Sequence, residues 1–185
     1  MEQLRERTNF LRTALLDRTV GAISVSSARV VADVVARLPK DAKLVIEYGP
    51  GDGVFTRALL GALPPNARLI VVEPNNDFVR ILKGITDPRL FVISGKAEEL
   101  SEGELTEFNG ADMLVASMPF SFLTPIERNK VVADAFHFLA PEGRFVISHQ
   151  YSWLMREPLR KVFRTVSLSF EIRNIFPCFV IEARK

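Results

Sequence analysis

The sequence predicts an α/β fold whose core is a mostly parallel sheet of seven strands. Short apolar runs alternate with segments of helical periodicity until five strands have been formed. These runs are apolar at consecutive positions, which is typical of strands buried on both faces of a parallel sheet. Two further β segments near the C-terminal end are joined too tightly for a parallel crossover, so we expect an antiparallel hairpin to close the sheet.

The first forty residues are expected to form a helical extension that precedes the sheet. Within residues 3–18, apolar side chains recur at helical spacing between arginines, at Leu4, Phe10, Leu11, Ala14 and Leu15. A short loop separates this amphipathic helix from a second helix over about 27–38. Seven basic residues against four acidic ones make residues 1–40 mildly cationic.

The strands and the remaining helices follow in order from residue 44. An apolar run at 44–46 rises into a glycine turn, and the helical periodicity of 54–63 completes a first strand and helix. By the same patterns we expect strands at 69–72, 90–93, 113–116 and 145–147, helices at 78–82, 125–139 and 159–163, and the closing hairpin at 166–175 and 178–183. No repeat, low-complexity tract or linker interrupts this order, so we expect one domain over residues 1–185.

The composition argues against several classes of protein. Hydrophobic residues make up 48% of the 185 residues, which is enough for a sizeable core. The 24 basic and 22 acidic side chains nearly cancel, so we expect no nucleic-acid partner. The single cysteine, Cys178, allows no intrachain disulfide, and with two distant histidines it makes no metal site. We find no bilayer-spanning run and no secretory signal, so we expect a cytoplasmic protein that touches a membrane only at its inner surface.

The turn after the first strand has the composition of a nucleoside-binding loop. Its motif consists of Glu47, Gly49, Pro50, Gly51 and Gly53. Glycines allow positive φ and a close approach of the backbone to a ligand, while the following helix offers N–H donors. Twenty residues further on, Glu73 ends the second strand just before Pro74, where a carboxylate can accept both hydroxyls of a ribose. Together these features predict an adenosine site.

The same turn favours a methyl donor over a nicotinamide dinucleotide, which remains the alternative. The spacing is Gly-x-Gly-x-Gly rather than the Gly-x-Gly-x-x-Gly that shields a pyrophosphate. Glu47 lies two residues before the first glycine, where a carboxylate could meet the cationic end of a methionine moiety. A dinucleotide has no use for that carboxylate. We therefore predict S-adenosylmethionine as the cofactor and S-adenosylhomocysteine as its product.

Residues 45–56, Val-Ile-Glu-Tyr-Gly-Pro-Gly-Asp-Gly-Val-Phe-Thr, resemble the first motif of class I S-adenosylmethionine-dependent methyltransferases. The fold of that class is Rossmann-like and ends in an antiparallel hairpin. Gly-Pro-Gly followed by Val-Phe-Thr is similar to the bacterial phospholipid N-methyltransferases and to their relatives, the ribosomal RNA adenine dimethylases. The chain also resembles the phospholipid enzymes at both of its ends, in residues 10–12, 21–23, 26–27 and 173–177. The resemblance covers roughly residues 9–182.

The resemblance implies an enzyme that methylates the amine of phosphatidylethanolamine, or of its partly methylated products, at a membrane surface. It also implies that the helix at 3–18 contacts anionic lipid, although the same helix could simply cover the pocket. A soluble small-molecule amine is therefore an alternative acceptor. RNA adenine is another, although we find no counterpart of the helical domain that RNA-dimethylating relatives carry after the sheet. A non-enzymatic binding module with this fold is the remaining alternative.

The fourth strand ends in Ser117-Met118-Pro119-Phe120, which resembles the Asn-x-Pro-Phe/Tyr loop of amino-directed methyltransferases. In such a loop a carbonyl can orient the amine while the aromatic ring faces the developing cation. Serine in place of asparagine argues against an adenine target, and we expect Ser117 to border both the cofactor and the acceptor. Pro119 and Phe120 could instead be only a packed strand end.

Two further segments are predicted to border the site. His149 and Tyr151 follow the fifth strand, and Tyr151 matches a tyrosine of the phospholipid enzymes; simple packing is the alternative for both. One weak base suffices, because methyl transfer needs only an unprotonated amine. After the third strand, Lys96 stands where the fold commonly supplies an aspartate to hold the adenine amino group. Glu98, or the backbone of Lys96 and Ala97, could take over that role.

Overall fold

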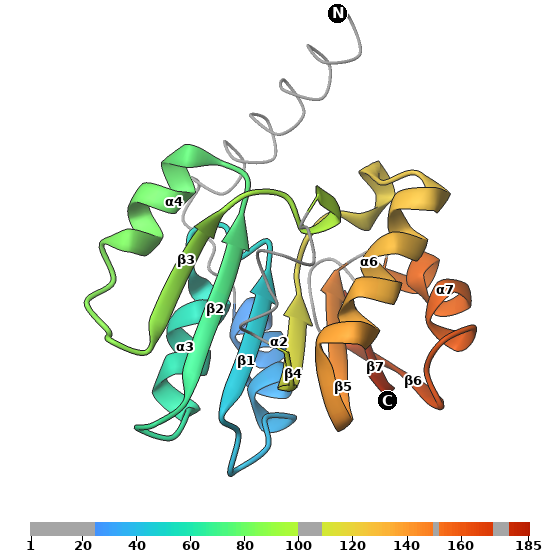
Figure 1. The fold of residues 1–185 in the computed structure, drawn as a ribbon, viewed down its shortest axis with the longest axis horizontal. Coiled ribbons are helices and arrows are strands. Elements are labelled where there is room, and N and C mark those ends of the chain that lie inside the picture. The colour runs from blue at the N-terminus through green and yellow to red at the C-terminus, as the bar shows by residue number, and fades with distance from the viewer. Residues whose placement is uncertain (1–24, 100–108, 150–151, 172–177) are drawn as a thin grey trace, which may run out of the picture.

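A seven-stranded sheet forms the centre of the molecule (Figure 1). The computed structural model describes residues 25–99, 109–149, 152–171 and 178–185. The strands lie in the order β3-β2-β1-β4-β5-β7-β6. Their bounds are β1 Leu44–Tyr48, β2 Arg68–Glu73, β3 Leu90–Ser94, β4 Ala111–Ala116, β5 Leu139–His149, β6 Thr165–Glu171 and β7 Cys178–Arg184. The expected seven-stranded α/β fold is confirmed.

The direction of the strands also agrees with the prediction. Strands β1 to β5 are parallel to one another, whereas β7 is antiparallel to both β5 and β6. Strand β5 begins six residues earlier than expected, because Leu139 already pairs with Ala111 before the register shifts to Met113 and Arg144. The polar stretch between these pairs, with Glu142 at φ 65°, concealed the start of the strand.

Helices cover both faces of the sheet. Their bounds are α2 Val25–Ala36, α3 Val54–Ala62, α4 Asn76–Lys83, α6 Pro125–Phe138 and α7 Arg156–Arg160, with short 3₁₀ turns η2 Ala97–Glu99, η4 Phe120–Phe122 and η5 Ser152–Met155. One apolar core lies beneath α2, α3 and α4 and the other beneath α6 and α7 (Figure 1). The expected helix at 3–18 lies outside the described residues.

Alternation along β1 assigns its side chains to these two cores. Ile46 and Tyr48 are buried on the side of α6, whereas Val45 is buried on the side of α2 and α3. Glu47 therefore points toward α3, where Thr56 contacts it. A carboxylate is thus placed inside an otherwise apolar layer.

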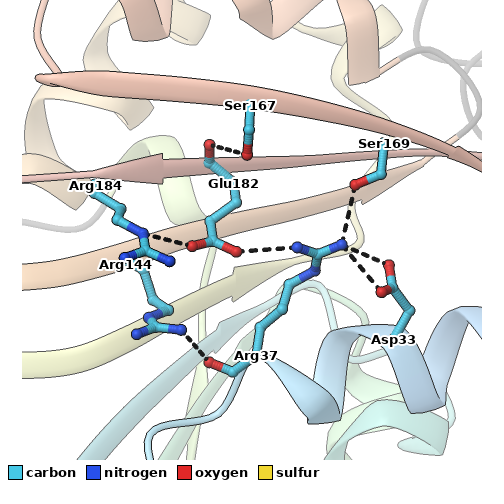
Figure 2. Close-up of polar contacts among 7 residues, drawn as sticks. All are labelled: Asp33, Arg37, Arg144, Ser167, Ser169, Glu182 and Arg184. Carbon is cyan, nitrogen blue, oxygen red and sulfur yellow. Dashed lines mark hydrogen bonds and ion pairs between the residues drawn. The ribbon is translucent and has the colours of Figure 1, made fainter.

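A polar cluster fastens α2 to the C-terminal strands (Figure 2). The Arg37 guanidinium donates to Glu182 Oε2 on β7 at 3.0 Å and to Ser169 Oγ on β6 at 3.0 Å. It also donates to Asp33 within α2, at 2.8 and 3.0 Å. Arg144 on β5 donates to the carbonyl of Arg37 at 2.8 Å, and Arg184 donates to Glu182 Oε1 at 2.7 Å. The first described helix is therefore joined to three strands from the other end of the sequence.

Candidate functional site

The loop between β1 and α3 has a backbone that requires its glycines. Gly49, Gly51 and Gly53 have φ angles of 68°, 58° and 86°, in the left-handed region that disfavours other residues. At Gly49 space is also short, since an added Cβ would lie 2.9 Å from the Cβ of Met118. The Gly-x-Gly-x-Gly spacing in the sequence therefore corresponds to three successive left-handed positions.

Backbone hydrogen bonds hold this glycine loop between two neighbouring strands. The Gly49 N–H donates to the carbonyl of Val72 on β2 at 3.0 Å. On the other side, Ser117 donates its N–H to the Tyr48 carbonyl at 3.1 Å and its hydroxyl to the Gly49 carbonyl at 2.8 Å. The loop lies where β1 has β2 on one side and β4 on the other, which is the switch point at which open α/β sheets bind ligands.

Glu73 at the end of β2 is tied directly to the glycine loop. Its side chain is buried, with Oε2 accepting from the Gly51 N–H at 3.0 Å and Oε1 accepting from the Asn75 N–H at 2.9 Å. Burial raises the pKa of Glu73, and these two hydrogen bonds partly offset the rise. Because each carboxylate oxygen has two lone pairs, both oxygens can still accept a hydroxyl.

Glu47 is the most deeply buried acidic group of the site. It has no solvent exposure, and its Oε2 accepts from Thr56 Oγ1 at 2.7 Å. Its Oε1 has no hydrogen-bond partner among the described residues. Burial raises the pKa of Glu47 to about 8, with the Thr56 hydroxyl opposing the rise and the charges of Glu73 and Asp52 adding to it. The carboxyl group is therefore mostly neutral at pH 7.

The turn after β3 lies beside Glu73. The Gly95 N–H donates to the Glu73 carbonyl at 3.1 Å, and Ala97 is buried at the start of η2. The Lys96 ammonium forms an ion pair with Glu99, and half of its side chain is exposed. The structure thus brings the backbone of this turn to the site while the charged end of Lys96 is engaged with its own helical turn.

The segment after β4 is held at both of its ends, by a hydrogen bond of Ser117 and by the burial of Phe120. Ser117 is bonded to the glycine loop, as described above, and Pro119 leads directly into η4. Phe120 has no solvent exposure and belongs to the core beneath α6 and α7. This burial favours the packing interpretation of Phe120, which the sequence left open.

Comparison with characterised proteins places this site in a known context. No protein-family model matches the chain. The ornithine lipid N-methyltransferase of Singulisphaera acidiphila is 29% identical over 167 residues, which span 85% of this chain and 84% of that protein. The ribosomal RNA small subunit methyltransferase A of Phenylobacterium zucineum is 38% identical over 96 residues, which span 50% of this chain and 32% of that protein.

Solved structures agree with these sequence relatives. The 1,6-didemethyltoxoflavin-N1-methyltransferase of Burkholderia thailandensis superposes with a TM-score of 0.73 at 19% identity, over 97% of this chain and 86% of that one. The chain has the fold of the class I methyltransferases. The precorrin-6y C5,15-methyltransferase of Geobacter metallireducens has a TM-score of 0.69 at 17% identity, over 85% and 89%. The predicted cofactor, S-adenosylmethionine, is the one that these relatives support.

The remaining predicted site residues, His149 and Tyr151, fall at or beyond the end of β5. His149 ends β5 and pairs in register with Phe179 of β7, so its backbone lies at the carboxyl edge of the parallel strands. Tyr151 lies outside the described residues. The sequence analysis missed Thr56 as the partner of Glu47, although its place three residues after Gly53, in the first turn of α3, was a usable signal.

Proposed function

We propose that this class I methyltransferase binds S-adenosylmethionine at the glycine loop and methylates the amine of a membrane-lipid headgroup. The observation that carries the proposal is Glu47, a buried carboxyl group whose Oε1 no described residue satisfies. Buried polar atoms are rarely left without a partner, so an orphaned oxygen beneath a ligand loop indicates a group that arrives with the ligand. The ammonium of the methionine moiety has the charge and the donors that Oε1 needs.

The other residues of the loop fit the same ligand. Glu73 is in place to accept the ribose hydroxyls while it holds the Gly51 N–H. The left-handed backbone at Gly49, Gly51 and Gly53 shapes the loop that receives the adenosine, and the backbone of Lys96 and Ala97 borders the adenine end. S-adenosylmethionine supplies a methyl group on a cationic sulfur, which makes that carbon electrophilic.

The acceptor side requires positioning more than acid–base catalysis. The amine nitrogen uses its lone pair to form a bond to the methyl carbon, and the electrons of the carbon–sulfur bond remain on sulfur. The methylated amine then loses a proton to solvent, or to a weak base such as His149 or Tyr151. The role of the segment from Ser117 to Pro119 is to fix the acceptor in line with the bond that breaks, while Phe120 anchors this segment in the core.

Two observations support a lipid as the acceptor. The relative that acts on ornithine lipid matches this chain over 85% of its length and 84% of its own, whereas the chain spans about a third of the ribosomal RNA methyltransferase. Just beyond the acceptor segment in the sequence, Phe122 on η4 is 36% exposed and Ile126 on α6 is 80% exposed, which suits contact with an apolar environment. Within the described residues we find no helix that is long and apolar enough to span a bilayer. Contact through residues 3–18 at the membrane surface belongs to this proposal.

The test is methyl transfer from labelled S-adenosylmethionine to three acceptors by the purified protein. Vesicles containing ornithine lipid, vesicles containing phosphatidylethanolamine, and free ethanolamine carry the same kind of amine with and without a bilayer. We expect label in one of the lipids and much less in ethanolamine. Gly51→Arg is the control, since it places a long side chain at a left-handed position of the loop and should remove activity. Equal labelling of ethanolamine would favour the soluble-amine alternative, and no labelling would contradict the proposal.

A further inference from the structure

Among the described residues, the surroundings of Glu47 contain acids but no compensating base. Glu73 at the end of β2 and Asp52 in the glycine loop are the charged groups that act on it, and both are acidic. From α3 the contact is the neutral hydroxyl of Thr56. The Arg57 guanidinium, also on α3, donates to the Asp52 carbonyl at 2.7 Å in an exposed position.

The remaining neighbours of Glu47 supply no charge to it either. On the flanking strands its register partners are Val71 of β2 and Val115 of β4. Helix α2 covers the same face, but its Asp33 pairs with Arg37, whose guanidinium is directed to β6 and β7. In the described part of the chain, Glu47 forms no salt bridge, and the Thr56 hydroxyl is its hydrogen-bond donor.

We propose that Glu47 is protonated before the cofactor binds and releases this proton when the ammonium of the methionine moiety reaches Oε1. The inference rests on the proposed function, because it needs the cofactor in this site. A buried carboxylate with no cation beside it is strongly disfavoured, whereas an ion pair with an ammonium is not. The proton of Glu47 passes to the buffer, and the ammonium keeps its own proton. The carboxylate that results pairs with the ammonium.

The number of protons released depends on pH in a calculable way. With the pKa of Glu47 near 8 in the empty protein, almost every molecule carries the proton at pH 6.5. An α-amino group has a pKa of about 8 in solution, so the free ligand is also almost fully protonated at that pH. Binding at pH 6.5 should therefore release close to one proton. The release should fall as the pH approaches 8, since both groups then begin to ionise in the free state.

The experiment is calorimetric titration at pH 6.5 in two buffers that differ in ionisation enthalpy. The difference in binding heat gives the number of protons exchanged. The ligands are S-adenosylhomocysteine, which has the ammonium, and 5′-methylthioadenosine, which has the same nucleoside but no amino acid. We expect close to one proton released with the first ligand and none with the second. Glu47→Gln should bind S-adenosylhomocysteine with no proton release.

Each outcome separates this inference from the function on which it rests. Binding of S-adenosylhomocysteine with no proton exchange would overturn the inference and leave the proposed cofactor site intact. Equal proton release by Glu47→Gln and the natural chain would overturn the assignment to Glu47. The comparison of the two ligands needs no variant, so it stands even where the substitution disturbs folding. Failure of both ligands to bind would overturn the proposed function and the inference with it.

Discussion

Two buried carboxyl groups lie on the same face of the sheet, and their pKa values move in opposite directions. Glu47 beneath α3 has a raised pKa because it is desolvated and receives one hydroxyl hydrogen bond. Glu182 on β7, beneath α2, is desolvated as well, but bonds from Arg184 and Arg37 outweigh burial and lower its pKa (Figure 2). The difference is the supply of cations by the chain itself.

This contrast distinguishes a structural acid from a binding acid. Both carboxylate oxygens of Glu182 have cationic donors from the fold itself, and Arg37 also donates to Asp33 and Ser169. At Glu47 the described residues leave one oxygen without a donor and provide no cation. We infer that stability is concentrated in the first region and ligand recognition in the second.

The largest effect that sharpens the comparison is expected at Glu182. Glu182→Gln removes the charge shared by Arg37 and Arg184 and leaves the partly buried Arg37 with Asp33 as its remaining acidic partner. Breaking one partner of a buried ion pair costs about 3 kcal/mol. Denaturant unfolding at pH 7 should show that loss, while the folded variant binds S-adenosylhomocysteine with unchanged affinity. A loss below about 1 kcal/mol would contradict the structural role.

The converse result is expected at Glu47. At pH 7 Glu47 is mostly neutral in the folded chain but ionised in the unfolded chain, where its pKa is 4.5, so Glu47→Gln removes the cost of protonation and should raise the free energy of unfolding by up to about 3 kcal/mol. The bound ligand loses a charged hydrogen bond, worth roughly 1.5–3 kcal/mol, so its affinity should fall about tenfold to a hundredfold. Titration with S-adenosylhomocysteine measures this. A large loss of stability with unchanged affinity would make Glu47 a structural residue like Glu182.

The two acids should also give opposite dependences of stability on pH. For Glu47 the folded pKa of about 8 lies above the unfolded value of 4.5, so its contribution is complete at low pH and is lost as pH rises to about 8. For Glu182 the folded pKa lies below 4.5, so its contribution is complete above that value and is lost as pH falls. Either slope is limited to about 1.4 kcal/mol per pH unit. Unfolding measured across pH should lose the alkaline slope in Glu47→Gln and the acid slope in Glu182→Gln.

The sequence predicted the binding region better than the structural one. Glu47, the glycines and Glu73 were found because they follow strands whose carboxyl ends meet at one edge of the sheet, a consequence of topology alone. The pairing of Arg37 with Glu182 spans 145 positions and depends on the register of β7 and on the packing of α2. Neither follows from a local pattern.

The acceptor side was predicted less well for a related reason. The pattern after β4 located the segment correctly, yet whether Phe120 faces a ligand or the core depends on how α6 and η4 pack. The Lys96 side chain forms an ion pair with Glu99, three residues later in the sequence. This spacing permits the ion pair but does not require it. Side-chain direction in such turns is decided by tertiary packing rather than by sequence periodicity.

The smallest effect is expected from removing a serine hydroxyl that donates to a backbone carbonyl. Each of the two regions has one such hydroxyl. Ser117 donates to Gly49 at 2.8 Å, and Ser167 donates to Glu182 at 3.3 Å. Removing one neutral hydrogen bond costs about 1 kcal/mol, so Ser117→Ala should loosen the glycine loop and weaken S-adenosylhomocysteine binding about fivefold. Ser167→Ala is the matched control and should leave affinity unchanged. If Ser117→Ala instead binds the nucleoside normally and raises only the KM for the acceptor, Ser117 belongs to the acceptor side. The boundary between cofactor-binding and acceptor-binding residues then lies before Ser117 rather than after it.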